Sequence, residues 1–373
     1  PPTRSDRMIA IEILALARAL IPVTIGVSGL ILLARARGTP QAGTRVSILI
    51  PARDEEANIA ACLDAAAASR GVEVEIIVMD DGSTDRTAAI VREHAARDPR
   101  IRLIACPPLP KGWTGKVHAC HRLSEAATGT HLLFIDADVR LEPDAAAAMA
   151  AHAQADGIAL VSGVPRQVIG SLGEALMVPA INLLMLGYLP GAGRAFTRDP
   201  GFAAATGQLL LADAAAYRAT GGHEAVRHLL HDGIALARRF RAAGHRTEVV
   251  DGAALATCRM YDGFGASWRG FLKNAHEGMA TPIGLPVWTL VLAGGHLLPW
   301  LLLPAPLALA ALGCSLGMRA AITLRMREPA WTILLHPATV AVALAIQWAS
   351  LVARLRGRPA GWKGRAYPAG GEA

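Results

Sequence analysis

The alternation of apolar and polar positions between Arg45 and about Gly163 predicts a series of strands and helices. Short apolar runs typical of strands cover residues 46–50, 74–79, 101–105, 131–135 and 158–162. Helical patterns lie between them over residues 56–69, 84–97 and 116–127, and Pro143 opens an alanine-rich helical stretch. Regular alternation of strand and helix favours a mostly parallel sheet with helices on both faces. The predicted fold class is therefore α/β.

A second pattern consists of long segments without charge. Residues 278–318 and 330–353 contain no Asp, Glu, Lys or Arg, and each exceeds the roughly 20 residues that a membrane-spanning helix needs. Residues 14–34 are apolar apart from Arg18, and we interpret them as a retained anchor because charged residues follow instead of a cleavage site. We expect an N-terminal membrane anchor over 1–40, an α/β domain over 41–280, membrane helices over 281–353 and a basic tail over 354–373.

The apolar segment from Val168 to Pro190 carries only Glu174 as a charged residue and is interrupted by Pro179 and Gly187. A helix of the protein core and an amphipathic helix lying in a membrane interface are both compatible with it. Both interpretations stay open at this point.

The net charge of +7 changes the picture because the basic residues crowd beside the apolar segments. A nucleic-acid interface would need a basic stripe with interleaved aromatic residues, which the sequence lacks, so no nucleic-acid partner is expected. Anionic lipid of an inner membrane suits these clusters, and the positive-inside rule places them, with the α/β domain, in the cytoplasm. Residues 330–353 separate two clusters, so either a segment there is re-entrant or interfacial or the rule is broken, and the number of membrane helices stays open. The clusters contain Arg35, Arg37, Arg45, Arg319, Arg325, Arg327, Arg354, Arg356, Arg358, Lys363 and Arg365.

Carboxylates follow two of the predicted strands. Asp136 and Asp138 come directly after the buried run 132–135, and Asp80 and Asp81 follow the run 74–79. Residues two apart at a strand end point to the same side, and two like charges so placed repel unless a cation lies between them. Ligands of parallel sheets bind beyond the carboxyl ends of the strands. We therefore predict a divalent metal, Mg²⁺ or Mn²⁺, at Asp136 and Asp138.

Two further positions could take part in chemistry. Gly115 and Lys116 open a helix and could offer backbone N–H groups and a cation to a diphosphate, although the segment is not a P-loop. Asp232 opens an arginine-rich helix, where it could be a helix cap or a base that removes a proton from a hydroxyl.

These motifs together resemble glycosyltransferase family 2, with its GT-A type domain, over roughly residues 46–278. The motifs are Pro51-Ala-Arg-Asp-Glu55, Asp80-Asp81-Gly-Ser83, Asp136-Ala-Asp138, Thr206-Gly207-Gln208 and Gly221-Gly222. The resemblance implies an inverting transfer from a nucleotide-sugar, with a catalytic domain at 41–280. It implies Asp232 as the base, metal binding by Asp136 and Asp138, and an acceptor region at Thr206, Gly207 and Gln208. The implied nucleotide-sugar site contains Pro51, Ala52, Arg53, Glu55, Asp80, Asp81, Gly115, Lys116, Asp136 and Ala137.

A narrower likeness extends over nearly the whole chain. The segments 110–116, 258–261, 270–274 and 362–365 are similar to bacterial membrane glycosyltransferases of carotenoid and hopanoid pathways. The likeness implies a lipid hydroxyl or carboxyl as acceptor, with Arg259 and Tyr261 in the acceptor region. His231 occupies the first position of the usual acidic pair there. The Gln-x-x-Arg-Trp motif of processive synthases is absent, which favours transfer of a single sugar. Transfer to polyprenyl phosphate, and a non-catalytic nucleotide-sensing scaffold, are the alternatives.

Overall fold

The computed structural model describes residues 3–275, 279–357, 360–362 and 365–367. It divides the chain into two compact units, each built from segments that are distant in sequence. The first unit contains residues 1–32, 169–192 and 261–362, and the second contains residues 33–168, 193–260 and 363–373. The predicted α/β segment 41–280 is therefore shared between them, since residues 169–192 and 261–280 belong with the terminal helices. Much of the predicted basic tail, including Lys363, lies outside the described residues.

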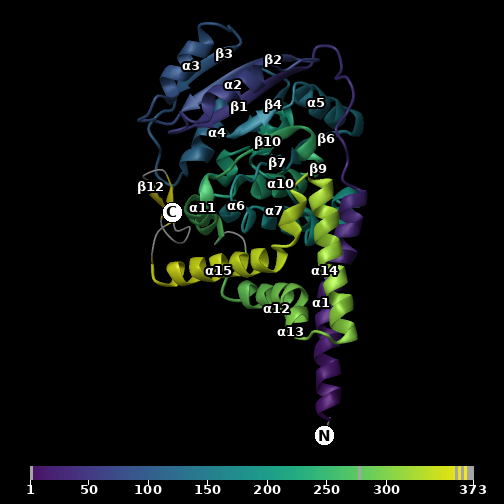
Figure 1. Ribbon diagram of the computed structural model, residues 1–373. Coiled ribbons are helices and arrows are strands. Elements are labelled where there is room, and N and C mark those ends of the chain that lie inside the picture. The colour runs from purple at the N-terminus through teal and green to yellow at the C-terminus, as the bar shows by residue number, and fades with distance from the viewer. Residues whose placement is uncertain (1–2, 276–278, 358–359, 363–364, 368–373) are drawn as a thin grey trace. The chain divides into compact units, whose positions relative to one another are not determined.

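The second unit is built on a seven-stranded sheet in the order β3-β2-β1-β4-β8-β6-β9 (Figure 1). Its pairs are parallel except for those that β8 makes with β4 and β6, so the predicted mostly parallel sheet is confirmed. The strands are β1 (Arg45–Ala52), β2 (Glu73–Asp80), β3 (Ile101–Ala105), β4 (His131–Ile135), β6 (Ile158–Gly163), β8 (Leu209–Asp213) and β9 (Arg246–Val250).

Helices cover both faces of this sheet. The helices of the second unit are α2 (Ile59–Ala67), α3 (Thr87–Ala95), α4 (Gly115–Ala126), α5 (Ala145–Asp156), α9 (Ala214–Ala219) and α10 (Asp232–Ala242). Alternate residues of a strand point to opposite faces, so Ile48 and Ile50 pack with α2 and α5 while Leu49 packs with α4 and α10. Both faces are apolar for this reason, and the strands lack the polar alternation of a sheet with one wet face.

A smaller three-stranded sheet lies beside the main one in the second unit. It consists of β5 (Val139–Leu141), β10 (Ala256–Cys258) and β7 (Arg166–Gln167), in the order β5-β10-β7. Short 3-10 turns η1 (Pro200–Phe202), η2 (Glu224–Val226) and η3 (Gly252–Ala254) connect the elements. Strand β5 begins directly after Asp138, so its pairing with β10 holds the backbone that follows the predicted metal motif.

The first unit is helical. It contains α1 (Arg4–Ile31), α6 (Leu172–Ala175), α7 (Pro179–Gly187), α11 (Gly263–Ala275), α12 (Gly284–His296), α13 (Leu298–Leu301), α14 (Pro306–Arg325), η4 (Ala330–Ile333) and α15 (His336–Leu355). Helix α8 (Gly191–Phe196) lies at the boundary of the units, and β11 (Ala360–Trp362) and β12 (Arg365–Tyr367) near the C-terminus. Helices α1 and α14 run side by side in the same direction, whereas α15 runs crosswise to them (Figure 1).

Among the described residues, α1, α14 and α15 are long and apolar enough to cross a membrane. The segment Val168–Pro190 forms α6 and α7, and α7 packs against α1, α14 and α15. Asn182, Leu183 and Leu186 of α7 are buried within the unit. Of the two interpretations offered for this segment, the structure favours the core helix.

A buried polar network joins the helices of the first unit. The guanidinium of Arg319 lies 2.6 Å from Glu328, and Asn182 Nδ2 donates to the same carboxylate at 2.7 Å. Arg319 is only 1% exposed, so its assignment to a lipid-facing basic cluster is wrong. A buried ion pair of this kind costs desolvation energy and acts mainly by fixing which faces of the helices meet.

A second buried carboxylate ties the strands of the sheet together. Glu75 of β2 accepts hydrogen bonds from Ser47 Oγ at 2.6 Å and from Thr128 N and Oγ1 at 2.7 and 2.8 Å, and Arg102 lies 3.1 Å away. Burial raises the pKa of Glu75, but these hydrogen bonds outweigh it and the net shift is below the ordinary value. Its contribution to stability is therefore present above the pKa of the unfolded chain and is lost as pH falls through the folded pKa.

We expect Glu75→Gln to lower the free energy of unfolding by about 1–3 kcal/mol at pH 7, because an amide cannot accept all these hydrogen bonds. The difference from wild type should shrink as the pH falls below about 4, where the wild-type carboxylate is also protonated. Thermal unfolding in detergent, followed by circular dichroism, measures both. Glu73→Gln on the same strand is the control, since Glu73 is 69% exposed and should change stability by less than about 0.5 kcal/mol. Equal effects of the two substitutions would contradict the role of Glu75.

Candidate active site

The carboxyl ends of three neighbouring strands bring the predicted site residues to one edge of the sheet. Strand β1 lies between β2 and β4, with Ala52 opposite Asp80 and Leu49 opposite Phe134. The segments that leave these strands, 53–56, 80–87 and 136–138, therefore start side by side. Pro51 and Ala52 end β1, and the Ala52 carbonyl accepts from Asp81 N at 2.8 Å.

Reciprocal hydrogen bonds join the first two of these segments. Thr84 N donates to Asp54 Oδ1 at 2.7 Å, Asp54 N donates to Ser83 Oγ at 3.0 Å, and Glu56 N donates to Asp85 Oδ2 at 2.9 Å. Asp54, which stands where the family usually has Asn, has a φ of 51°. This left-handed backbone conformation is uncommon for residues other than Gly, Asn and Asp, so an aspartate suits the position.

Further hydrogen bonds hold the predicted nucleotide-binding residues in these segments. Arg53 Nη1 donates to the Asp81 carbonyl at 2.7 Å, and Asp80 Oδ1 accepts from Ser83 N at 3.0 Å. Asp81 is only 7% exposed. Asp80 therefore helps to cap the turn after β2.

Asp136 and Asp138 are partly buried in an acidic environment, with Ala137 buried between them. Burial, together with the nearby Asp136 and Glu55, raises the pKa of Asp138 to about 7. The pKa of Asp136 is also raised by burial, although the Lys116 ammonium opposes the shift. Asp138 Oδ1 is buried and has no hydrogen-bond partner among the described residues. An orphaned carboxylate oxygen beside two further carboxylates fits a divalent cation, since hard cations prefer oxygen ligands.

Lys116 connects Asp136 with Asp232. Its ammonium lies 2.6 Å from Asp136 Oδ1 and 3.9 Å from Asp232 Oδ2, and it donates to the Gly207 carbonyl at 3.4 Å. Burial lowers the pKa of Lys116, but the two carboxylates outweigh this and raise it above the ordinary value. Lys116 is therefore a permanent positive charge between the predicted metal ligand and the predicted base. Gly115 precedes it as the first residue of α4.

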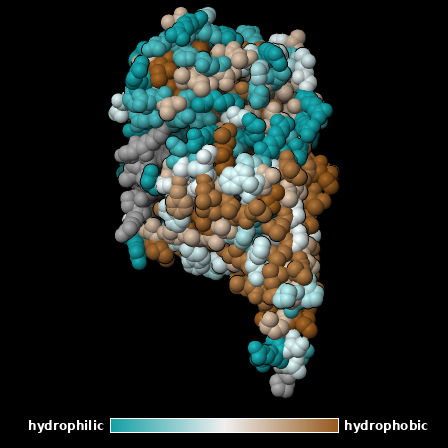
Figure 2. All heavy atoms as spheres, in the orientation of Figure 1, coloured by the Kyte–Doolittle hydropathy of each residue, from teal (hydrophilic) through white to brown (hydrophobic). Residues whose placement is uncertain are grey.

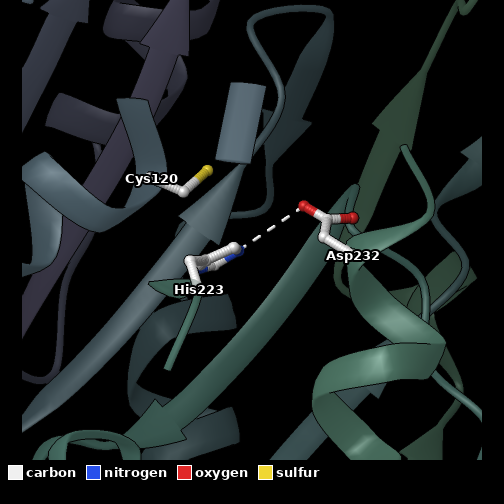
Figure 3. Close-up of side chains that lie close together, drawn as sticks. All are labelled: Cys120, His223 and Asp232. Carbon is white, nitrogen blue, oxygen red and sulfur yellow. Dashed lines mark ion pairs between the residues drawn. The ribbon is translucent and has the colours of Figure 1, made fainter. Parts of the chain in front are cut away.

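Asp232 opens α10 and is 6% exposed. Burial raises its pKa, but Lys116 and His223 outweigh this effect and the net shift is well below the ordinary value. His223 Nε2 lies 3.5 Å from Asp232 Oδ2, and Cys120 of α4 is the third polar side chain of this cluster (Figure 3). Neither His223 nor Cys120 was among the residues predicted from sequence.

Glycines allow the backbone to approach Asp232 closely. A Cβ at Gly207 would lie 2.5 Å from Asp232 Oδ1 and 3.0 Å from Lys116 Nζ. A Cβ at Gly233 would lie 2.8 Å from the backbone of Thr206 and Gly207. The predicted acceptor segment 206–208 is therefore packed directly on the start of α10, and the structure brings it together with Asp232.

Gln208 extends the site in another direction. Its Nε2 donates to Cys258 Sγ at 3.3 Å, its Oε1 accepts from Gln167 at 3.2 Å, and the Cys258 thiol hydrogen-bonds Asp138. Cys258 therefore connects the predicted acceptor segment with the predicted metal motif. Sequence reasoning missed this role because a lone cysteine at position 258 gives no local signal.

Three predicted residues of the acceptor region remain, namely His231, Arg259 and Tyr261. His231 precedes Asp232 as the N-cap of α10, and its charge contributes to the low pKa of Asp232. Arg259 is exposed in the second unit. Tyr261 belongs to the first unit, where its ring packs on Gly270 and Phe271 of α11.

Comparison with known proteins gives an independent result. Residues 47–213 match the family described as "Glycosyl transferase family 2". The chain is 31% identical over 238 residues to 4,4'-diaponeurosporenoate glycosyltransferase of Staphylococcus aureus strain MRSA252, and 30% identical to that of strain USA300. Each match covers 62% of this chain and 61% of the relative, so the chain spans less than two thirds of the length of these relatives. The resemblance to this family and to its carotenoid-associated members is confirmed.

A solved structure shows the same fold. The mannosyltransferase PcManGT from Pyrobaculum calidifontis, in complex with GDP-Man and Mn²⁺, superposes with a TM-score of 0.57. The match covers 92% of this chain and 99% of that chain at 21% sequence identity. The predicted GT-A type α/β fold is confirmed.

Substitution of Gly207 tests the close packing around Asp232. We expect Gly207→Ala to lower the free energy of unfolding by about 1–3 kcal/mol, because the added methyl group overlaps Asp232 and Lys116. Thermal unfolding in detergent measures the change. Gly317→Ala in α14 is the control, since a Cβ there meets no atom within 4 Å, and it should leave stability unchanged or raise it by up to about 1 kcal/mol. A neutral Gly207→Ala would show that the site has room for a side chain.

Proposed function

We propose that this chain, which contains a glycosyltransferase family 2 domain at residues 47–213, transfers a single sugar from a nucleotide-sugar to a lipid acceptor at a membrane. The observation that carries the proposal is the partly buried arrangement of Asp136, Asp138 and Lys116, with the buried Asp232 on the other side of the lysine. Carboxylates for a metal, an ammonium for a diphosphate and a candidate base thus lie in one unit. The transfer is proposed to invert the anomeric carbon, as expected for the family.

The donor site is proposed at the strand ends. The joined segments 51–56 and 80–85 present Arg53, Asp80 and Asp81 on a rigid backbone, where carboxylates can accept from a base N–H or a ribose hydroxyl. Glu55 accepts from Asn58 Nδ2 at 3.1 Å and lies near both aspartates of the metal motif. Gly115 and Lys116 at the start of α4 would face the diphosphate.

Asp136 and Asp138 are proposed to hold a divalent metal, Mg²⁺ or Mn²⁺. When bound, such an ion neutralises charge on the leaving diphosphate as a Lewis acid. PcManGT was solved with Mn²⁺ and GDP-Man, which supports the same class of cofactor and donor here. Lys116 would exchange its contact with Asp136 for one with the diphosphate, so the acidic pair becomes available as the donor arrives.

The acceptor is proposed to react with the help of Asp232. The acceptor oxygen forms a bond to the anomeric carbon, its proton passes to the Asp232 carboxylate, and the bond from that carbon to the nucleoside diphosphate breaks with its electron pair. Thr206, Gly207 and Gln208, packed on Asp232, would line the acceptor side. Contact of Lys116 with a diphosphate would remove the nearest cation from Asp232 and make it a stronger base.

A lipid carboxylate is an alternative to a lipid hydroxyl as acceptor. A carboxylate or phosphate arrives as an anion and needs little assistance from a base. The curated relatives are named for 4,4'-diaponeurosporenoate, and the suffix denotes a carboxylate. Transfer to polyprenyl phosphate remains the second candidate on the same ground. Turnover of a nucleotide-sugar would exclude the third, a non-catalytic scaffold.

A lipid acceptor agrees with the surface of the first unit. Apolar residues gather along α1 and α14, and hydrophilic residues stand at the N-terminal tip of α1 (Figure 2). Ile13, Leu14 and Leu309 are at least half exposed. We propose that α1 and α14 cross the bilayer and that α15, which runs crosswise, lies along it (Figure 1). This arrangement would allow the basic residues at both ends of α15 to meet one leaflet, as the positive-inside rule requires. The proposed location is the inner membrane, with the catalytic domain in the cytoplasm.

Removal of the proposed metal ligand tests metal dependence. We expect Asp138→Asn to lower kcat by about 100-fold or more, since Lewis-acid stabilisation of a leaving group amounts to several kcal/mol. The assay incubates membranes that contain the protein with a panel of nucleotide-sugars, in the presence of EDTA or of added Mg²⁺ or Mn²⁺. Mass spectrometry of the lipid extract then detects the product. Asp64→Asn is the control, because Asp64 is 74% exposed on α2. If Asp138→Asn keeps wild-type turnover and metal response, the metal assignment is wrong.

Substitution of Asp232 distinguishes the acceptor classes. With a lipid hydroxyl as acceptor, we expect Asp232→Asn to lower kcat by about 100- to 10,000-fold, the usual contribution of a general base. With a lipid carboxylate or phosphate, the loss should stay below about tenfold. The assay uses the same lipid extract with each acceptor supplied in detergent. Near-normal turnover of a hydroxyl acceptor, with donor binding intact, would contradict the role of Asp232 as base.

A further inference from the structure

A buried chain of polar side chains leads from Tyr217 through His223 to Asp232. Tyr217 OH lies 2.6 Å from His223 Nδ1. His223 Nε2 lies 3.5 Å from Asp232 Oδ2, the pair marked by the dashed line in Figure 3. Tyr217 and His223 are 3% and 2% exposed. The second distance exceeds an ordinary hydrogen bond, but catalytic contacts are often long before substrates bind. The chain therefore ends on the oxygen of Asp232 that also faces Lys116.

The surroundings determine where His223 carries its proton. Burial lowers the pKa of His223, so the ring is neutral at pH 7 and holds one N–H. Asp232 is an anion that can only accept, which favours the proton on Nε2. Nδ1 is then the acceptor for the Tyr217 hydroxyl, whose oxygen also accepts from the His223 backbone N–H at 2.9 Å. In this arrangement each hydrogen-bond donor of Tyr217 and His223 faces an acceptor.

The fold holds both rings in place. Gly221 and Gly222 have φ of +82° and +47°, and a Cβ at Gly222 would lie 2.3 Å from the Tyr217 ring. Phe134 of β4 packs against both rings, with centroid distances of 5.5 Å to Tyr217 and 4.8 Å to His223. A tight glycine turn and an aromatic contact with the central sheet thus leave His223 little freedom.

The same side chains could be considered as a metal site. The ligand atoms of Cys120, His223 and Asp232 lie within 4.8 Å of one another. Burial disfavours a cation here, because it raises the pKa of the Cys120 thiol well above its ordinary value. A thiolate is required for metal binding. The chain of Tyr217, His223 and Asp232 therefore fits a hydrogen-bonded arrangement better.

We propose that His223, held by Tyr217, is a positioning residue that fixes the Asp232 carboxylate for the acceptor. His223 and Lys116 both face Oδ2, which leaves Oδ1 directed toward Gly207 and the acceptor segment. The proposal rests on the proposed function, because the role of His223 is exerted through Asp232 as base. The proposal gives His223 a role toward Asp232, the proposed general base, and none toward the sugar or the nucleotide.

Kinetics of matched variants test this role. His223→Phe keeps an aromatic ring without an N–H, His223→Gln keeps a donor, and Tyr217→Phe removes only the hydroxyl. We expect His223→Phe to lower kcat by about 10- to 100-fold with the KM for the nucleotide-sugar unchanged, a range typical of residues that orient a reacting group. His223→Gln and Tyr217→Phe should lose less. His152→Gln is the control, since His152 pairs with Glu248 at 3.1 Å in the same unit but outside the site, and it should keep wild-type kcat.

A second measurement does not depend on turnover. Solid-state NMR of the full-length chain in bilayers, labelled with ¹⁵N-histidine, reports which ring nitrogen carries the proton, and the His223→Gln spectrum assigns the signal. We expect the Nε2–H form in wild type and a shifted Nδ1 resonance in Tyr217→Phe. A wild-type ring with its proton on Nδ1 would overturn the proposal whatever the activity.

The outcomes separate the two proposals. A loss of turnover in Asp232→Asn and a partial loss in His223→Phe support both. If Asp232→Asn is impaired but His223→Phe retains wild-type kcat, the positioning role is overturned while the proposed function stands. If Asp232→Asn is unimpaired with every acceptor, the base assignment fails, and the positioning role fails with it. A changed nucleotide-sugar KM with unchanged kcat in His223→Phe would also overturn the positioning role.

Discussion

The repulsion between partly buried carboxylates at one sheet edge is the constraint on which the rest of the site depends. Asp136 and Glu55 lie close enough to Asp138 to raise its pKa, Glu55 also raises the pKa of Asp136, and burial reduces the water that would screen these charges. Lys116 compensates part of this charge through its contact with Asp136. Asp138 Oδ1 is buried and has no hydrogen-bond partner among the described residues, so the negative charge at this edge is only partly neutralised. A metal ion and the shift of Lys116 to a diphosphate would resolve that shortage together.

Close backbone contacts allow so many charged groups to gather in a small volume. Gly207 and Gly233 bring the acceptor segment against the start of α10, and a side chain at either position would meet atoms at less than 3 Å. Gly163 and Gly252 make a similar contact where β6 meets η3. These glycines are required by space, since neither Gly207 nor Gly233 has a positive φ. Positions that appear interchangeable in sequence are therefore among the most constrained in the structure.

The sequence predicted the α/β elements well because each strand is a short apolar run between clear turns. The expected strand 131–135 agrees with β4 to the residue, and the expected edge with Asp80, Asp81, Asp136 and Asp138 follows from parallel pairing. Long-range partners could not be predicted in the same way. No local pattern places Cys258 beside Asp138, Lys116 beside Asp232, or residues 169–192 with the terminal helices. Arg319 was assigned to a lipid-facing cluster because its partner, Glu328, lies beyond the turn that follows α14.

The case of His223 shows what a motif can and cannot convey. Gly221 and Gly222 indicated an acceptor region, and the next residue is the one that faces Asp232. The two glycines have positive φ and form the turn directly before His223, whose ring packs against Phe134 and faces Asp232. His223 fixes the direction of the Asp232 carboxylate and helps to lower its pKa, whereas Lys116, which can exchange partners, contributes the largest charge that lowers this pKa. A site arranged in this way can keep its base oriented while the strength of that base changes with the contents of the donor site.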